Sequence, residues 1–63
     1  MISAEKFLTL SKTQAQDLAE VNNMLFRLIS KDGDSFMPYP EDHREDRVCV
    51  ELIKNRVSVA KIC

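Results

Sequence analysis

Apolar residues recur at steps of three or four through the first half of the chain, which is the spacing of one face of an α-helix. Ser11 is followed three residues later by Gln14, a pattern typical of a capping box at a helix start. Gly33 can take the left-handed conformation that often ends a helix. The pattern therefore predicts a helix over residues 11–31, whose apolar face comprises Leu18, Val21, Leu25, Leu28 and Ile29.

The two ends of the chain have the pattern of short strands. Residues 5–10 alternate, with Phe7 and Thr9 on one side. Residues 56–62 carry β-branched side chains at three positions and contain neither Pro nor Gly, which favours a strand. We therefore expect one strand over 5–10 and a second over 56–62.

The middle of the chain combines a loop with a second predicted helix. Pro40 suits the first position of a helix, and the acidic residues after it suit the positive end of the helix dipole. The core contacts of this helix would be Val48, Cys49, Leu52 and Ile53. We predict a helix over 40–54. The loop over 32–40 either packs as a connector against the first helix or forms a mobile loop beside a substrate, and we favour the packed connector.

Together these elements predict an α+β fold in a single small domain over residues 1–63, in the order strand, helix, helix, strand. Two strands do not close a sheet, and an isolated strand pair is marginally stable in water. A chain of this length buries only about 60% of the surface that its unfolded form exposes. We therefore expect a second chain to complete the sheet, in a homo-oligomer or with a protein partner, through an interface of Leu18, Val21, Leu25, Leu28, Ile29, Val57 and Val59.

Charge patterning narrows the kinds of partner that are expected. The chain has 9 basic and 10 acidic residues and a net charge of −1, with both signs interspersed. This pattern gives no basic footprint for nucleic acid or for an anionic membrane. No apolar run approaches the roughly 20 residues of a membrane-spanning helix, and the start of the chain lacks the pattern of a signal peptide. We expect a soluble cytoplasmic protein that binds neither nucleic acid nor membrane.

Chemically reactive side chains do not form a complete catalytic, cofactor or metal site. His43 lies among charged residues, whereas a general acid or base would need an apolar pocket and a positioned partner. Asp32-Gly33-Asp34 resembles part of a calcium loop but lacks the other oxygen ligands. With one glycine in the chain, a glycine-rich phosphate loop cannot be built. We predict no catalytic residue, no cofactor and no metal in this chain.

The two cysteines permit at most one internal disulfide. Cys49 falls on the apolar face of the second predicted helix, where it would be a small core residue. Cys63 follows the last predicted strand and could be exposed, so that it could form a disulfide between two chains in air. In a cytoplasmic protein we expect two inert, reduced thiols.

The order strand, capped helix, loop, helix, strand resembles the opening of a GNAT-type N-acetyltransferase. The resemblance rests on Phe7-Leu-Thr-Leu-Ser-Lys-Thr-Gln-Ala-Gln-Asp-Leu18, on the helix through Ile29 and on the strand through Ile62, and it covers nearly the whole chain. It implies the N-terminal segment of an acetyltransferase, inactive alone. The pyrophosphate-binding signature of that family, Arg/Gln-x-x-Gly-x-Gly/Ala, is not found in the chain, so acetyl-coenzyme A would bind only in a longer parent.

A different class of protein fits the same residues. The chain could be a self-contained interaction protein without catalytic activity, either a homodimer or a small inhibitor. It would then dock the apolar face over residues 18–29 on its partner.

Overall fold

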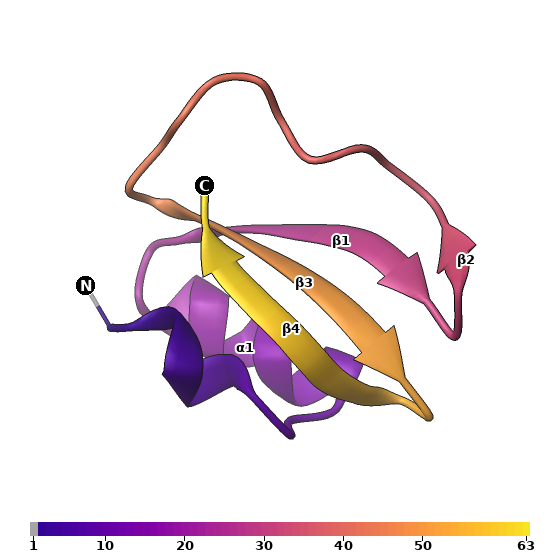
Figure 1. Cartoon of the computed structure of the whole chain (residues 1–63). Helices are drawn as coiled ribbons and strands as arrows, with labels where there is room; N and C mark the ends of the chain where they lie inside the picture. The colour runs from indigo at the N-terminus through magenta and orange to yellow at the C-terminus, as the bar shows by residue number, and fades with distance from the viewer. Residues whose placement is uncertain (1) are drawn as a thin grey trace.

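A mixed four-stranded sheet separates two layers of the chain (Figure 1). The computed structural model describes residues 2–63. Helix α1 and the short 3-10 helix η1 lie on one face of the sheet, and the segment between β2 and β3 crosses the other face. The α+β class is therefore confirmed. The elements in order are η1 (Ala4–Phe7), α1 (Lys12–Val21), β1 (Leu25–Lys31), β2 (Asp34–Ser35), β3 (Arg47–Ile53) and β4 (Arg56–Ile62).

The strands lie in the order β2-β1-β3-β4. β1 and β3 run parallel, while β2 pairs antiparallel with β1 and β4 pairs antiparallel with β3. Parallel neighbours cannot be joined by a tight turn, because the chain must return to the starting end of the sheet. Residues 36–46 make this return, and we call them the crossover loop.

The start of α1 is the predicted capping box. The hydroxyl of Ser11 accepts a hydrogen bond from the amide of Gln14 at 3.2 Å, and the Gln14 side chain accepts one from the amide of Ser11 at 3.0 Å. These bonds satisfy two backbone donors that the first helical turn leaves without a partner.

The prediction that this helix runs to residue 31 is wrong, because α1 ends at Val21. Asn23 takes a φ of 55°, and the amides of Asn23 and Met24 donate to the carbonyls of Glu20 and Ala19 at 3.0 and 2.8 Å. This is a Schellman ending, in which Asn replaces the more usual Gly. The apolar residues that follow fit a strand as well as a helix over so short a run, and pairing with β3 decides between the two.

The predicted helix over 40–54 is also wrong. Its first half is irregular, and its second half is the strand β3. Val48, Val50 and Leu52 alternate along β3 and are fully buried, which identifies them as the inward face of a central strand. Lys54 and Asn55, with φ of 51° and 62°, form a two-residue turn into β4, and such a turn joins antiparallel strands.

The ends of the chain differ in how well they follow the prediction. The strand expected over 5–10 is absent, and η1 occupies the first half of that stretch, with Phe7 fully buried against the sheet. The 3-10 turn directs Phe7 toward the sheet face, and the backbone of Thr9 and Leu10 then hydrogen-bonds to Val57 at the edge of β4. The strand expected over 56–62 is present as β4.

The apolar core lies between α1 with η1 and the inward face of the sheet. It brings together helix, 3-10 helix and strand residues whose sequence positions span the whole chain. Its buried members are Phe7, Ala15, Ala19, Met24, Val48, Val50, Leu52 and Val57. No helix within residues 2–63 is long and apolar enough to cross a membrane.

Candidate protein-binding loop

The crossover loop is an exposed segment without helix or strand that passes over the sheet face opposite α1. Most of its side chains are exposed, and only Tyr39, Pro40 and Asp46 are partly buried. Phe36 and Met37, two adjacent large apolar side chains, are 57% and 46% exposed. This exposure makes the loop the first candidate for a surface that contacts another molecule.

The loop begins from a tight hairpin. Asp32 and Gly33, with φ of 51° and 87°, turn β1 into β2. The amides of Phe36 and Met37 then both donate to the carbonyl of Ile29, at 2.8 and 3.2 Å. These bonds tie the first loop residues to the edge of β1.

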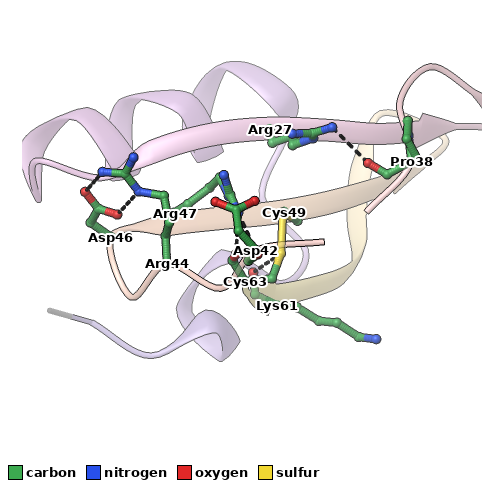
Figure 2. Close-up of polar contacts among 9 residues, drawn as sticks. All are labelled: Arg27, Pro38, Asp42, Arg44, Asp46, Arg47, Cys49, Lys61 and Cys63. Atoms are coloured by element: carbon green, nitrogen blue, oxygen red, sulfur yellow. Dashed lines mark hydrogen bonds and ion pairs between the residues drawn. A yellow bond between two sulfur atoms is a disulfide. The ribbon is translucent and has the colours of Figure 1, made fainter. Parts of the chain in front are cut away.

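Arg27 supplies the next anchor. Its guanidinium Nη2 donates to the carbonyl oxygen of Pro38 at 3.0 Å (Figure 2). Arg27 projects from β1 on the sheet face opposite the core. Its side chain therefore connects the sheet to the backbone of the loop that crosses this face. Pro38 and Pro40 each fix their own φ, which limits the conformations of the segment between them.

Tyr39 forms the middle anchor. Its hydroxyl donates to the carboxylate of Glu51 on β3, which also accepts from the Ser30 hydroxyl at 3.0 Å. The Lys61 amine lies 5.1 Å from the centre of the Tyr39 ring. Burial and the hydrogen bond to Glu51 raise the pKa of Tyr39 to about 12, while the Tyr39 and Ser30 hydrogen bonds lower the pKa of Glu51. The phenol therefore stays protonated and the carboxylate ionised, which keeps this anchor intact at neutral pH.

Arg47 holds the far side of the loop. Its Nη2 donates to the carbonyl of Asp42 at 3.0 Å, to the carboxylate of Asp42 at 3.3 Å and to the carbonyl of Cys63 at 2.7 Å (Figure 2). The Arg47 side chain is only 11% exposed. Its hydrogen bond lowers the pKa of the Asp42 carboxyl, so the ion pair persists at neutral pH. One guanidinium thus connects the loop to the residue that follows β4.

The end of the loop is bound to both β1 and residue 63. Arg44 and Asp46 form a two-bond ion pair with both nitrogen–oxygen distances at 2.9 Å. The amide of Arg44 donates to the carbonyl of Cys63 at 3.1 Å, and the carbonyl of Asp46 accepts from the amide of Leu25 at 2.7 Å. The backbone is therefore fixed before it enters β3.

These anchors hold the backbone at several points of a segment that has no helix or strand, bends at Glu41 and Asp42, and exposes most of its side chains. Glu41, His43 and Glu45 alternate along it and are exposed. The loop carries four acidic residues and one basic residue. Such a segment can present a fixed row of side chains to another molecule without first losing backbone entropy.

The predicted interface residues do not form one surface. Ile29 and Val57 are 5% and 2% exposed and belong to the interior, whereas Val21 and Leu25 are 76% and 50% exposed. Leu18, Leu28 and Val59 are partly buried. Because the chain changes from helix to strand between Val21 and Leu25, the apolar stripe predicted for one helix is divided between α1 and β1.

The side chains considered for chemistry are also dispersed. His43 is exposed in the crossover loop, and Asp32-Gly33-Asp34 forms the β1–β2 turn. Within residues 2–63, no three His, Cys, Asp or Glu side chains are placed to hold a metal ion. Cys49 is fully buried, as expected, but it lies on β3 rather than on a helix, and its sulfur is bonded to that of Cys63 instead of being a free thiol.

The sequence indicates that this loop packs against the rest of the protein, but it predicts packing at a different place from the one in the structure. The apolar residues between Gly33 and Pro40 suggest a segment that packs, and the expected partner is the first helix. In the structure Tyr39 instead packs on the opposite face of the sheet, against Glu51 and Lys61. The anchoring arginines could not be assigned without knowing that their segments are strands.

Comparison with protein-family models, curated proteins and solved structures finds no match for this chain.

The Tyr39 anchor gives a direct optical prediction. Tyr39 is the sole tyrosine and the chain has no tryptophan, so absorbance near 295 nm reports its ionisation alone. We expect a midpoint about two pH units above the ordinary value of 10, since the folded protein has a Tyr39 pKa of about 12. The stabilising effect of this anchor is then complete below pH 10 and is lost as pH rises through 12. Glu51→Gln should move the midpoint downward, and a midpoint of 10 in the folded wild type would contradict the anchor.

Proposed function

We propose that this chain is a small non-catalytic interaction protein that binds a partner protein through the crossover loop, and that it acts as an inhibitor. The observation that carries this proposal is the set of anchors at Pro38, Tyr39 and Asp42. They restrain an exposed segment in the free protein. The proposed contact surface is therefore the loop, in place of the apolar helix face expected from the sequence.

Preorganisation is the physical reason for assigning binding to this segment. A flexible loop loses backbone and side-chain freedom when it binds, which weakens the complex. Six residues of the crossover loop have a backbone group hydrogen-bonded to β1, β3 or residue 63: Phe36, Met37, Pro38, Asp42, Arg44 and Asp46. Pre-formed interfaces of this kind are typical of complexes in which the backbone moves little on binding.

A peptidase is the partner class that we favour. Peptidases accept an exposed peptide segment in a cleft, and the loop is an exposed segment without helix or strand. The anchors at Pro38 and Asp42 lie on either side of Pro40 and Glu41. If a peptidase cut the bond between Pro40 and Glu41, both new ends would stay attached to the same sheet. Neither new chain end would then leave the peptidase complex readily, and the complex would persist.

The test is inhibition by the purified chain of a panel of serine, cysteine, aspartic and metallopeptidases with different side-chain preferences. We expect at least one class to be inhibited by the wild type. Phe36→Asp, in the loop, should weaken that inhibition by at least about tenfold, since an exposed apolar contact is replaced by a charge.

Val21→Asp is the matched control, because Val21 is a more exposed apolar residue on α1, outside the loop. It should leave the inhibition constant within about twofold. Loss of inhibition with Val21→Asp and its retention with Phe36→Asp would overturn the assignment to the loop. Absence of inhibition throughout the panel would overturn the assignment to peptidases.

A second copy of the chain is an alternative partner, as the sequence suggests. β4 is the last strand in the sheet order, and Thr9 and Leu10 exchange backbone hydrogen bonds with its Val57 at 2.9 and 2.8 Å. A second chain would complete the sheet along the rest of this edge. Light scattering tests this directly: the mass would be twice 7.2 kDa, and a monomer at all concentrations would contradict it.

The resemblance to GNAT-type N-acetyltransferases stays a prediction. It was based on the order strand, helix, helix, strand, whereas β1 and β3 occupy the later parts of the two regions assigned to helices. The cytoplasmic location stays a prediction, since the Cys49–Cys63 disulfide is of a kind that persists in oxidising compartments. The absence of nucleic-acid and membrane partners is part of the proposal. No bound cofactor enters the proposed function.

A further inference from the structure

The Cys49–Cys63 disulfide lies beside the anchors of the crossover loop. It joins β3 to the residue that follows β4, with the two Cα atoms 6.4 Å apart (Figure 2). Cys49 is fully buried, and Cys63 is partly exposed. Of the two residues, Cys63 is therefore the one that a reagent from solvent approaches first.

Residue 63 is also where three hydrogen bonds from the loop region converge. Its carbonyl accepts from Arg47 Nη2 at 2.7 Å and from the amide of Arg44 at 3.1 Å, and its own amide donates to the carbonyl of Arg47 at 3.1 Å. The same Arg47 nitrogen holds Asp42. Without the covalent bond, residue 63 would be held by these hydrogen bonds and by the pairing of the preceding Ile62 with Val48.

We propose that this disulfide is a redox-controlled lock on the crossover loop, and that dithiol reductants are its chemical substrates. A thiolate of the dithiol attacks the Cys63 sulfur and displaces the Cys49 sulfur as a thiolate, which takes up a proton. The second thiol of the reductant then attacks the mixed disulfide and displaces the Cys63 sulfur. Two electrons and two protons pass to the protein, and the reductant becomes a disulfide.

Reduction removes the covalent link between residue 63 and Cys49, and thereby weakens the hydrogen bonds of Arg47 and Arg44 to the carbonyl of residue 63. This inference rests on the proposed function for its biological consequence, namely that binding by the loop is stronger in an oxidising compartment and weaker in a reducing one. The change in the loop itself can be measured without any partner.

Amide hydrogen exchange before and after treatment with dithiothreitol, a small dithiol, tests the lock. We expect protection at Arg44 to fall by about tenfold or more, which corresponds to the net effect of one hydrogen bond. The amide of Asp32, which donates to Leu52 at the opposite end of β3, is the internal control and should change little. Cys63→Ser should show the weaker Arg44 protection from the outset and should not respond to dithiothreitol.

Thiol titration gives a measurement that does not depend on any variant. Protein purified without reductant should contain no titratable thiol in the native state and two after reduction. Two free thiols in the untreated protein, or unchanged Arg44 protection on reduction with Asp32 still protected, would overturn the proposal. A peptidase inhibited equally by both redox forms would overturn the lock but leave the proposed function standing. Redox-dependent protection without any inhibition would support the lock and overturn the proposed function.

Discussion

Replacing Leu52 by alanine is expected to lower the free energy of unfolding by about 2–5 kcal/mol. Leu52 is fully buried on β3 and packs in the core between the sheet and α1. A domain of this size has a total stability on the order of 3–9 kcal/mol, so the loss would be a large part of it. Urea unfolding followed by circular dichroism measures the change.

Ile53→Ala is the matched control for this prediction. Ile53 is the next residue of β3 but is 48% exposed, because successive strand residues point to opposite faces. We expect it to cost less than about 1 kcal/mol. In the helix predicted from the sequence, both residues were core contacts. Equal losses for the two variants would therefore argue against β3 as a strand.

Arg47→Ala is expected to release the far side of the crossover loop and to destabilise the protein by about 2 kcal/mol. The variant loses the bonds to the Asp42 carbonyl, the Asp42 carboxylate and the Cys63 carbonyl together. A charged donor that is largely buried contributes more than an exposed one, which is why the expected loss exceeds that of an ordinary surface ion pair. Unfolding in urea gives the stability, and proton exchange at Arg44 reports the loop.

Two other arginine variants make the Arg47 prediction specific. Arg56→Ala removes an exposed arginine whose contact is a single bond to the Thr9 carbonyl at 3.5 Å, and it should cost less than about 0.5 kcal/mol. Arg47→Lys keeps the charge but loses the planar fork, so it should recover only part of the loss. If Arg47→Ala and Arg56→Ala have the same small effect, Arg47 does not anchor the loop.

The sequence predicted the structure correctly where the structure depends on residues that are close together in the chain. Ser11 and Gln14 cap α1 as predicted, because the capping box involves only residues three positions apart. The stretch over 56–62 forms a strand as predicted, since its β-branched residues and lack of Pro and Gly act locally. The α+β class follows from these two elements.

The errors arise where pairing between distant segments overrides a local pattern. Asn22 and Asn23 end α1, although the apolar spacing continues past them. Residues 25–31 and 47–53 have spacings that also fit helices, and they become strands because they pair with each other in parallel. Only after that pairing is known do Arg27 and Arg47 point to the same side of a sheet and reach the loop.

The sequence therefore indicated that the loop has an unusual composition, but it did not indicate that the loop is a binding surface. Phe36, Met37 and Tyr39 between two turn-forming segments suggested packing, and packing was assigned to the wrong face. The disulfide was equally inaccessible to sequence reasoning, because the proximity of Cys49 and Cys63 depends on the antiparallel pairing of β3 with β4.

The most direct test of the central claim is the backbone mobility of the crossover loop in the free, oxidised protein. Nitrogen-15 relaxation gives an order parameter for each amide from Phe36 to Asp46 except the two prolines. We predict values near about 0.8 at Tyr39, Asp42 and Arg44, close to those of rigid backbone. Values below about 0.6 at these three residues would mean that the anchors do not hold the loop, and would contradict its role as a preorganised binding segment.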